Sequence, residues 1–249
     1  MVVEPIPDAP AAVVDTGEGR ALAVADYHAG LESHLRREGV ELDPADEQRR
    51  EQLLSLLAES DPDRLVLLGD LATSIGEPTG EERAEIEALL EAVSVPITIV
   101  KGNHDGEIES VVGDQRDVTV TDGEGTRIGS VGFAHGHTWP APAVLEAEIV
   151  CVAHEHPVVR LEDEVGGARA ERVWLRGRVE PGPFRDHFGD RLGTVSAEMV
   201  VFPAFNDRSG GTWVNVEGRD FLSPFLPAGL ADGEAYLLDG TRLGPYQRL

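Results

Sequence analysis

The residues of this chain best suited to chemistry lie in five short clusters of histidine, aspartate and asparagine. Each cluster directly follows an apolar run of the kind that forms a buried strand. In α/β sheets, ligands bind at the carboxyl ends of strands. Six of the chain's eight histidines fall in these clusters, so a shared site is predicted. The clusters are Asp26-Tyr27-His28, Gly69-Asp70, Gly102-Asn103-His104-Asp105, His135-Gly136-His137 and His154-Glu155-His156.

The spacing inside two clusters favours a metal site. Residues i and i+2 of a strand point to the same face, so Asp26 with His28, and His154 with His156, could each reach one site. Carboxylate, imidazole and amide oxygen ligands suit divalent ions such as Mn, Fe or Zn, and the lack of cysteine in the clusters argues against structural zinc. Any one pair taken alone is more often a surface turn or a core histidine than a metal site. Five clusters at strand ends predict a metal centre.

The elements that must position the clusters alternate up to residue 105. Apolar runs ending at residues 25, 68 and 100 are separated by segments with helical spacing, which predicts right-handed βαβ units. Asp43 with Pro44 predicts the start of one helix, and Thr79 with Glu82 predicts a capping box at the start of another. After residue 115 short strands and turns dominate, beginning at Val118. We expect these strands to form a second sheet.

Length and composition bound the class of protein. The 249 residues can bury one sizeable core, and residues 1–249 are predicted to form a single domain of two facing sheets. The single cysteine, Cys151, excludes an internal disulfide. No apolar run reaches 18 residues, so no membrane association is expected. The first residues resemble no secretory leader, and a cytoplasmic location is expected.

The charge of the chain is strongly negative. The formal net charge is -25, and Lys101 is the only lysine. Such a charge repels itself and weakens the compact state in dilute buffer. At about 1 M salt the Debye length falls to ~3 Å, which screens the repulsion. The composition therefore predicts a halophilic protein from a salt-rich cytoplasm, and the alternative is an ordinary acidic protein.

The ordered motifs D-x-H, G-D, G-N-H-D, H-G-H and H-x-H resemble those of the calcineurin-like metallophosphoesterase superfamily. Within it, the chain looks most like small archaeal phosphoesterases related to the SbcD nuclease, through Asp26-Tyr27-His28-Ala29-Gly30-Leu31-Glu32 and Pro203-Ala204-Phe205 among other motifs. The resemblance covers nearly the whole chain. It implies an α/β fold, a four-layer αββα sandwich of two facing mixed sheets.

The resemblance also implies a site with two divalent metal ions, Mn before Fe, Zn or Ni. The implied metal ligands are Asp26, His28 and His156 for one ion and Asn103, His135 and His154 for the other, with Asp70 bridging both. His104 would be the catalytic histidine, and Asp105 would orient it. Two ions ~3.5–4 Å apart clamp a phosphate and activate a bridging hydroxide, which attacks phosphorus in line. His137 is left without an assigned role.

The implied activity is hydrolysis of a phosphate mono- or diester. One alternative is an SbcD-like DNA exo- or endonuclease, but DNA binding depends on basic contacts to phosphates and this chain is acidic. A second alternative is a non-catalytic scaffold, which would have lost ligands, whereas every ligand position is filled. Seven arginines between Arg160 and Arg191 could contact substrate, through Arg176 or Arg178, or form exposed ion pairs. The oligomeric state is left open.

Overall fold

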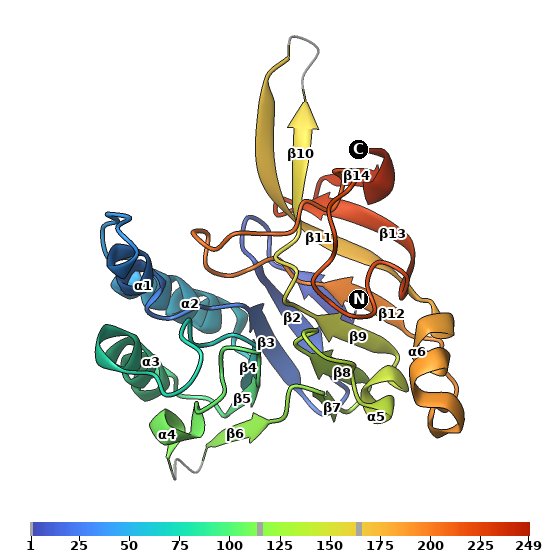
Figure 1. Ribbon diagram of the computed structural model, residues 1–249. Coiled ribbons are helices and arrows are strands. Elements are labelled where there is room, and N and C mark those ends of the chain that lie inside the picture. Colours follow the sequence, from blue (N-terminus) through green and yellow to red (C-terminus); the bar gives the residue numbers. More distant parts are fainter. Residues whose placement is uncertain (1, 114–116, 163–165) are drawn as a thin grey trace.

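Two β-sheets pack face to face, and helices cover the outer side of each sheet (Figure 1). The computed structural model describes residues 2–113, 117–162 and 166–249. Both sheets contain parallel and antiparallel pairs of strands. The α/β sandwich of two facing mixed sheets that the sequence predicted is therefore confirmed.

The first sheet has six strands in the described residues, in the order β1-β2-β3-β4-β5-β6. Its strands are β1 (Val3–Pro5), β2 (Ala11–Asp15), β3 (Arg20–Ala25), β4 (Arg64–Leu68), β5 (Ile97–Val100) and β6 (Val118–Thr121). Strands β3 to β6 run parallel to one another. The expectation that the strands after residue 115 all join a second sheet was wrong for β6, because β6 pairs with β5 and extends the first sheet.

The second sheet runs in the order β14-β13-β11-β12-β9-β8-β7 over the described part of the chain, and β10 pairs with β11. Its strands are β7 (Thr126–Ile128), β8 (Val131–Ala134), β9 (Ile149–Val152), β10 (Val158–Glu162), β11 (Ala168–Val179), β12 (Glu198–Val201), β13 (Leu230–Leu237) and β14 (Arg242–Pro245). The β10–β11 hairpin projects from the body of the molecule (Figure 1). Strands β8, β9 and β12 are parallel, so their carboxyl ends share one edge.

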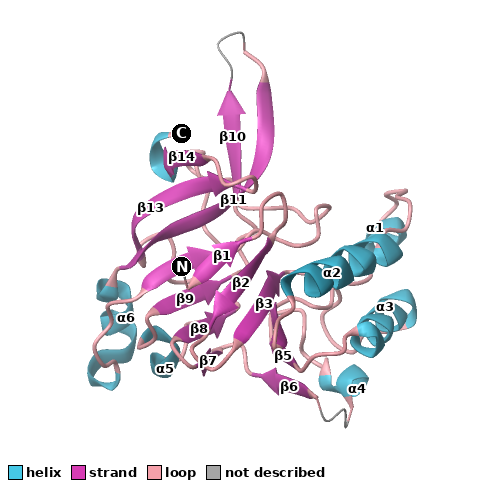
Figure 2. Ribbon diagram, turned by 180° about the vertical axis from the view of Figure 1, so that it is seen from behind, coloured by secondary structure: helices cyan, strands magenta, loops and turns pink. Residues whose placement is uncertain are grey.

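The helices lie on the outer faces of the two sheets (Figure 2). They are α1 (Leu31–Arg37), α2 (Asp46–Ser60), α3 (Gly80–Ala92) and α4 (Glu109–Val112) beside the first sheet, and α5 (Pro142–Leu145) and α6 (Pro181–Phe188) beside the second. Short 3-10 turns follow at Gly189–Arg191 and Tyr246–Arg248. Across the residues that are described, none of the helices has the length and apolar character needed to cross a membrane.

Two predicted helix starts differ from the structure. Helix α2 begins at Asp46 after Ala45, so the predicted start at Asp43 and Pro44 was wrong. Thr79 does precede α3, but its side chain makes no capping hydrogen bond. Glu82 accepts the backbone N–H groups of residues 73 and 74, at 2.7 Å each, because its carboxylate faces the loop after β4. The capping-box prediction therefore placed the helix correctly and assigned Glu82 the wrong partner.

Three buried clusters of hydrophobic residues fill the spaces between the layers of the described structure. Strand β3 shows how one strand serves two of them, because alternate residues point to opposite faces. Leu22 and Val24 pack toward α2 and α3, whereas Ala21 and Ala23 face the second sheet. The small alanines let the two sheets approach closely at this strand, which carries the first of the five clusters at its end.

Candidate metal centre

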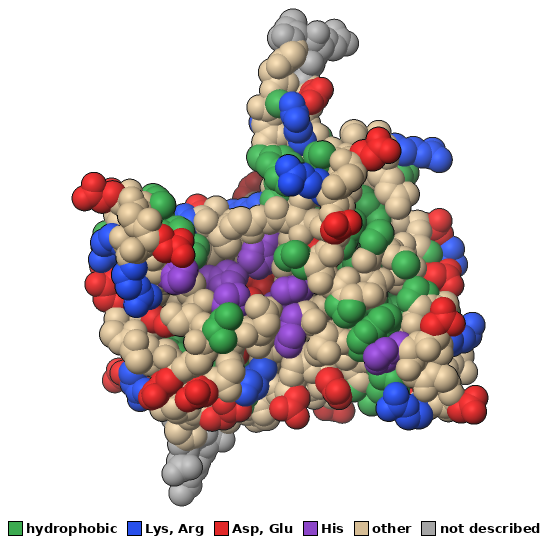
Figure 3. Space-filling model, in the orientation of Figure 1, with side chains coloured by type: hydrophobic (Ala, Val, Ile, Leu, Met, Phe, Trp, Pro, Cys, Tyr) green, Lys and Arg blue, Asp and Glu red, His purple; other side chains and the backbone are tan. Residues whose placement is uncertain are grey.

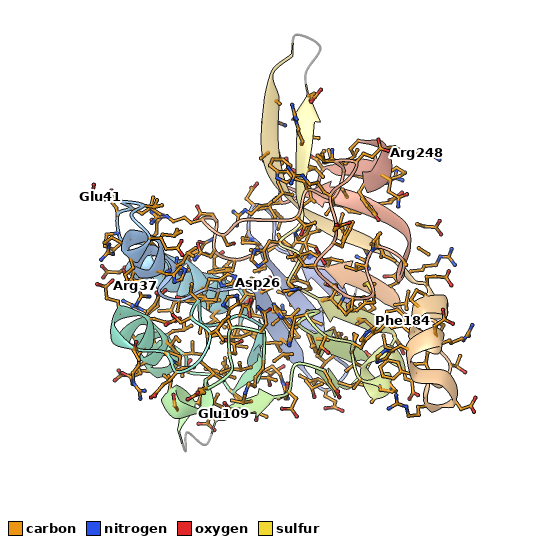
Figure 4. All side chains as sticks on the ribbon, in the orientation of Figure 1. Asp26, Arg37, Glu41, Glu109, Phe184 and Arg248 are labelled. Atoms are coloured by element: carbon orange, nitrogen blue, oxygen red, sulfur yellow. The ribbon has the colours of Figure 1, made fainter. Side chains whose placement is uncertain are left out.

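The five clusters meet where the two sheets come together. Asp26 follows β3, and Figure 4 shows it at the centre of the molecule, between the two halves. Its Oδ1 lies 2.9 Å from Nε2 of His135, which follows β8 of the other sheet. Figure 3 shows the histidine side chains gathered in a band on this face. The parallel strands of both sheets therefore end at one shared site, as their order in the sequence predicted.

Two groups of side chains in the described residues could each hold a metal ion. They are Asp26, His28 and His156, and Asp70, His135 and His154. Within each group the ligand atoms lie within 4.8 Å of one another. Six of the seven predicted metal ligands therefore lie in two compact groups. The seventh, Asn103, follows β5 and has an exposed side chain, so its role as a ligand stays a prediction.

The backbone is bent unusually at these residues. Positive φ is uncommon for residues other than glycine. In the described residues, eight non-glycine residues have positive φ, and five of them belong to the two groups. These five are Asp26 (53°), His28 (48°), Asp70 (41°), His154 (71°) and His156 (44°). Left-handed conformations at functional residues store backbone strain that the surrounding fold must offset.

Two glycines make room for the ligands. A Cβ atom on Gly69 would lie 2.0 Å from Cδ2 of His135, and a Cβ atom on Gly102 would lie 2.0 Å from Oδ1 of Asp70. Gly69 also has a φ of 76°. The glycines of the G-D and G-N-H-D motifs are therefore required because side chains of the site pack directly against their backbone.

Carbonyl oxygens orient two of the imidazole rings. Nδ1 of His156 lies 2.6 Å from the carbonyl oxygen of Gly210, and Nδ1 of His104 lies 2.5 Å from that of Thr73. Because a carbonyl can only accept, Nδ1 carries the proton in both rings, and Nε2 keeps its lone pair when the ring is neutral. For His156 this makes Nε2 the nitrogen that could bind a metal, once its ring has lost the second proton.

His137 belongs to the same network. Its Nδ1 lies 3.0 Å from Nδ1 of His135, so the second histidine of H-G-H contacts the first. His137 is thus placed to hold the ring of His135, a role that its sequence position left open.

Asp105, which was predicted to orient His104, makes its hydrogen bonds to backbone N–H groups. Its buried carboxylate accepts the backbone N–H groups of Leu71, Ala72 and Gly102, at 3.3, 2.9 and 2.8 Å. The ring of His104 pairs with the carbonyl oxygen of Thr73, and the predicted role of Asp105 in orienting His104 stays a prediction. Asp105 ties the loop after β4 to the loop after β5, since both loops must be fixed for Asp70 to face the site. Burial, with the nearby charge of Asp70, raises the pKa of Asp105 to about 6.

The electrostatics of the centre favour a cation. Asp26 is fully buried and Asp70 is 2 % exposed. Burial would raise the pKa of Asp26, but His156 and His135 outweigh it and hold that pKa well below its usual range. Burial lowers the pKa of both His28 and His154 to about 4, which keeps these rings neutral at pH 7. For His156, the charge of Asp26 outweighs burial and raises the pKa to about 9.

The donor atoms of the first group fit a divalent metal ion. Nε2 of His28 and Nε2 of His156 face each other at 3.3 Å, and Oδ1 of Asp26 lies 3.3 Å from Nε2 of His156. Nδ1 of His28 is buried and has no hydrogen-bond partner among the described residues. Imidazole nitrogens and carboxylate oxygens that converge in this way are the ligands of Zn, Fe and Mn sites.

A loop from the second sheet supports the Asp26-His28 turn. The N–H of Phe205 donates to the carbonyl of Ala25 at 2.7 Å, and the ring of Phe205 stacks on Tyr27 at 5.8 Å. The side chain of Asn206 donates to the carbonyl oxygen of His28 at 3.2 Å. The Pro-Ala-Phe motif of the sequence therefore acts by fixing the backbone of the first cluster.

Glu155, between the two histidines of H-x-H, supports the turn that carries His154 and His156. It is fully buried and accepts from the hydroxyl of Thr212 at 2.8 Å and from the N–H of Ser223 at 2.7 Å. Because His154 and His156 lie on one side of the turn, Glu155 points to the other side and anchors residues 212–223 there.

Behind the first cluster lies a buried network of charges that sequence reasoning missed. Arg49 of α2 donates to Glu32 at 3.0 and 3.1 Å and to Glu85 at 2.9 and 2.7 Å. Glu85 also accepts the N–H of Gly30 at 2.7 Å. Glu32 was quoted as part of the first motif, but only the fold reveals that Arg49 is its partner.

The arginine-rich stretch was predicted either to contact substrate or to form ion pairs. Arg176 pairs with Glu198 at 2.7 Å, and Arg178 pairs with Asp232. Arg160 and Arg169 also pair, with Glu162 and Glu171 on their own hairpin. These contacts favour the alternative of exposed strands with ion pairs.

Fold and site together define a class, the metal-dependent phosphoesterases with two facing sheets and histidine-carboxylate clusters at the strand ends. The sequence profile of the calcineurin-like phosphoesterases matches residues 19–177, more than half of the chain. The chain belongs to the calcineurin-like phosphoesterase family. No curated protein sequence matches it significantly.

Two solved structures were compared with the chain. The crystal structure of Pseudomonas putida nuclease MPE is similar, with a TM-score of 0.58 and 19 % identity, over 97 % of this chain and 100 % of that one. YfcE, a phosphoesterase from E. coli, gives a TM-score of 0.37 and 21 % identity over 57 % of this chain and 73 % of its own. The first likeness supports the fold alone.

Proposed function

We propose that residues 1–249 form one domain, a dinuclear metal-dependent phosphoesterase that hydrolyses phosphate mono- or diesters. The observation that carries the proposal is the pair of three-residue groups of candidate metal ligands at the ends of β3, β4, β8 and β9. A scaffold that had lost activity would not need to keep both groups, nor the bent backbone at five of their residues. The carboxylate and amide oxygens suit Mn, and the imidazole nitrogens suit Fe, Zn or Ni; among these we propose Mn, which the family resemblance implies.

In the proposed site each group holds one ion. Asp26, His28 and His156 would hold the first, and His135 and His154, with Asn103, would hold the second; Asp70, which belongs to the second group, would serve both ions. Two bound divalent ions would stabilise the charge of the phosphoryl oxygens and lower the pKa of a water molecule. The chain's own contribution is to fix the ligand rings and to exclude alternative geometries through the Gly210 and His137 contacts.

His104 is the proposed catalytic acid. Its Nε2 lies 3.9 Å from Oδ2 of Asp70, and its side chain is 29 % exposed, so a substrate can reach it. The carbonyl of Thr73 holds Nδ1–H, which leaves Nε2 as the atom that donates a proton to the leaving oxygen when the ring is charged. The N–H of His104 also donates to Asp70 at 2.9 Å, which fixes the loop.

The test is an activity screen in molar KCl with Mn²⁺. It sets p-nitrophenyl phosphate, bis-p-nitrophenyl phosphate, cyclic nucleotides and DNA side by side. We expect Mn²⁺-dependent release of p-nitrophenol that chelation abolishes. No hydrolysis of any of these esters by the metal-loaded protein would refute the proposed function.

Two variants test the division of roles. Asp70→Asn removes the carboxylate that is proposed to serve both metal ions. This variant should have less bound metal and lower activity than the wild type. His104→Gln should keep the metal content of the wild type and lose 10²–10⁴-fold in kcat, the usual contribution of a general acid. The loss should be larger for alkyl esters than for p-nitrophenyl esters, since p-nitrophenolate leaves without a proton. If His104→Gln loses metal as fully as Asp70→Asn, His104 is a ligand instead.

DNA cleavage of the SbcD type is a second candidate, which the projecting hairpin favours. Arg160, Arg169 and Arg219 line a cavity of about 440 Å³ together with Trp213. Arginine beside a half-buried aromatic ring such as that of Trp213 suits single-stranded nucleic acid. The local pairing of Arg160 and Arg169 with glutamates and the net charge of -25 weigh against it.

We also propose a halophilic, cytoplasmic protein from the charge of the chain.

A further inference from the structure

A cavity of about 610 Å³ opens beside the first metal group. Residues of the site line the cavity together with apolar and polar side chains. The lining residues are His28, Leu31, His34, Leu35, Thr73, Ser74, Ile75, His104, His156, Arg208, Ser209 and Gly210. The cavity therefore begins at the atoms where a phosphate ester would react, on the side of the proposed catalytic acid.

Helix α1 is turned so that its apolar residues serve this cavity. The residue that α1 buries is Glu32, which binds Arg49. Leu31 and Leu35, one turn apart, are half-buried and line the cavity together with His34. An ordinary surface helix buries its leucines in the core. Helix α1 buries a glutamate and places its leucines at the cavity, which indicates that these leucines contact a ligand.

The loop after β4 adds an apolar side chain to the lining. Ile75 is 81 % exposed, the most exposed of the large hydrophobic side chains in the described residues. Its loop is fixed, because Glu82 accepts the N–H groups of Thr73 and Ser74. A large aliphatic side chain held in water beside a metal centre costs solubility without stabilising the fold. It is therefore explained by a ligand that covers it.

The charge of the lining points to an anionic ligand with a weakly polar body. The chain has 46 aspartates and glutamates, yet none of them lines this cavity in the described structure. Arg208 stands at its edge, where Glu32 holds it at 3.3 Å and the carbonyl of Asp43 accepts from it. Imidazole rings and a guanidinium group present flat faces, on which planar groups stack.

We propose that this cavity binds the nucleobase of a nucleotide substrate, on the leaving-group side of the reacting phosphate. The inference rests on the proposed phosphoesterase function. Phosphate lies at the metal groups, the sugar oxygen faces His104, and the base packs against Leu35 and Ile75 with His34 at the rim. The proposal makes Ile75 and Leu35 specificity-determining residues, which act on KM and on binding of base-bearing ligands.

The test compares two ligands with the same phosphate ester oxygen, adenosine 5′-monophosphate and ribose 5-phosphate. Each is titrated by calorimetry into the Mn²⁺-loaded protein in molar KCl. We expect the wild type to bind the nucleotide about tenfold or more tightly than the sugar phosphate, because the base buries apolar surface of Leu35 and Ile75. Equal binding of the two ligands would overturn the proposal.

Variants locate the effect. Ile75→Ser should reduce the preference for the nucleotide several-fold and change ribose 5-phosphate binding less than twofold, whereas Ile75→Phe should keep the preference. Because Ile75 is exposed, its replacement does not endanger folding. Val40→Ser, another exposed aliphatic residue at 46 %, lies outside the lining and should leave both affinities unchanged. A preference that survives Ile75→Ser and Leu35→Ser alike would place the base elsewhere and refute the assignment.

Calorimetry also separates this inference from the function on which it rests. A nucleotide preference that depends on Ile75, in a protein that hydrolyses no phosphate ester, would overturn the proposed function and support the cavity as a nucleotide site. Hydrolysis of p-nitrophenyl esters with no preference for the nucleotide would support the function and overturn the inference.

Discussion

Replacing Arg49 by Met is the sharpest test of how the fold holds the first cluster. Arg49, Glu32 and Glu85 are 5 %, 3 % and 4 % exposed, and two carboxylates share the one guanidinium group. Burial would raise the pKa of Glu32, but its hydrogen bonds to Arg49 outweigh burial and lower it; for Glu85 burial prevails and raises the pKa. Without Arg49, Glu85 stays buried and loses its charged partner, and Glu32 keeps only the longer contact with Arg208, at 3.3 Å.

The expected cost follows from the burial of the network. Removing one partner of a buried ion pair destabilises a protein by ~3–5 kcal/mol. For 150–250 residues each kcal/mol lowers Tm by ~2–4 °C, so Arg49→Met should lower Tm by roughly 6–20 °C. High salt should not remove the effect, because buried pairs are screened far less than exposed ones.

The matched control is Arg83→Met. Arg83 lies on α3 and pairs with Glu87 at 2.7 Å and Glu77 at 3.5 Å, but its side chain is 36 % exposed. Exposed pairs contribute ~0–1 kcal/mol. Urea denaturation and calorimetry of both variants in 3 M KCl would measure the difference. Equal losses of stability in the two variants would refute the reasoning.

A third variant separates lost charge pairing from lost packing. Arg49→Met combined with Glu32→Gln and Glu85→Gln removes the unpaired charges and should recover part of the stability. The arginine also lies 5.3 Å from the centroid of the Tyr27 ring, a contact that the triple variant does not restore. No recovery at all would mean that packing against Tyr27 dominates.

Three further predictions follow from packing, charge and burial. Gly102→Ala should lose bound metal and ~1–3 kcal/mol of stability through overpacking against Asp70. The control is Gly106→Ala, whose Cβ would lie 3.9 Å from its nearest neighbour and which should be close to wild type. Equal behaviour of the two variants would contradict the close approach of Gly102 to Asp70. The net charge of -25 predicts a higher thermal midpoint by circular dichroism in 3 M than in 0.1 M KCl, and an unchanged midpoint would exclude the halophilic interpretation. Cys151 is fully buried, which raises the pKa of its thiol, so Ellman's reagent should label it only after unfolding in urea; rapid labelling of the native protein would contradict its placement in β9.

Local pattern was sufficient for the elements and for the members of the site. Apolar runs of four to six residues bounded by turn residues predicted β3, β4 and β5, because strand formation is encoded in neighbouring side chains. The same pattern placed a cluster at the end of each run. Since parallel strands of one sheet end at a common edge, the gathering of the clusters that follow β3, β4 and β5 could also be predicted.

Pairings over long distances in sequence could not be predicted. His28 and His156 are 128 residues apart, and Asp26 and His135 are 109 apart. Their contacts depend on how two sheets pack, which no local window contains. The partner of β6 shows the same limit, since a strand pattern does not state which sheet the strand will join.

The sequence by itself determined the chemistry of this protein: which residues can bind metals, in what order, and on which kind of element. Only the tertiary structure decided their partners. In the folded chain the carboxylates of Glu82 and Asp105 accept hydrogen bonds from backbone N–H groups of the loop after β4. The leucines of α1 line a cavity, and the backbone is left-handed at Asp26 and His154. The reason is physical: a side chain's type fixes what it can bind, whereas the partner it meets depends on packing free energy summed over the whole chain.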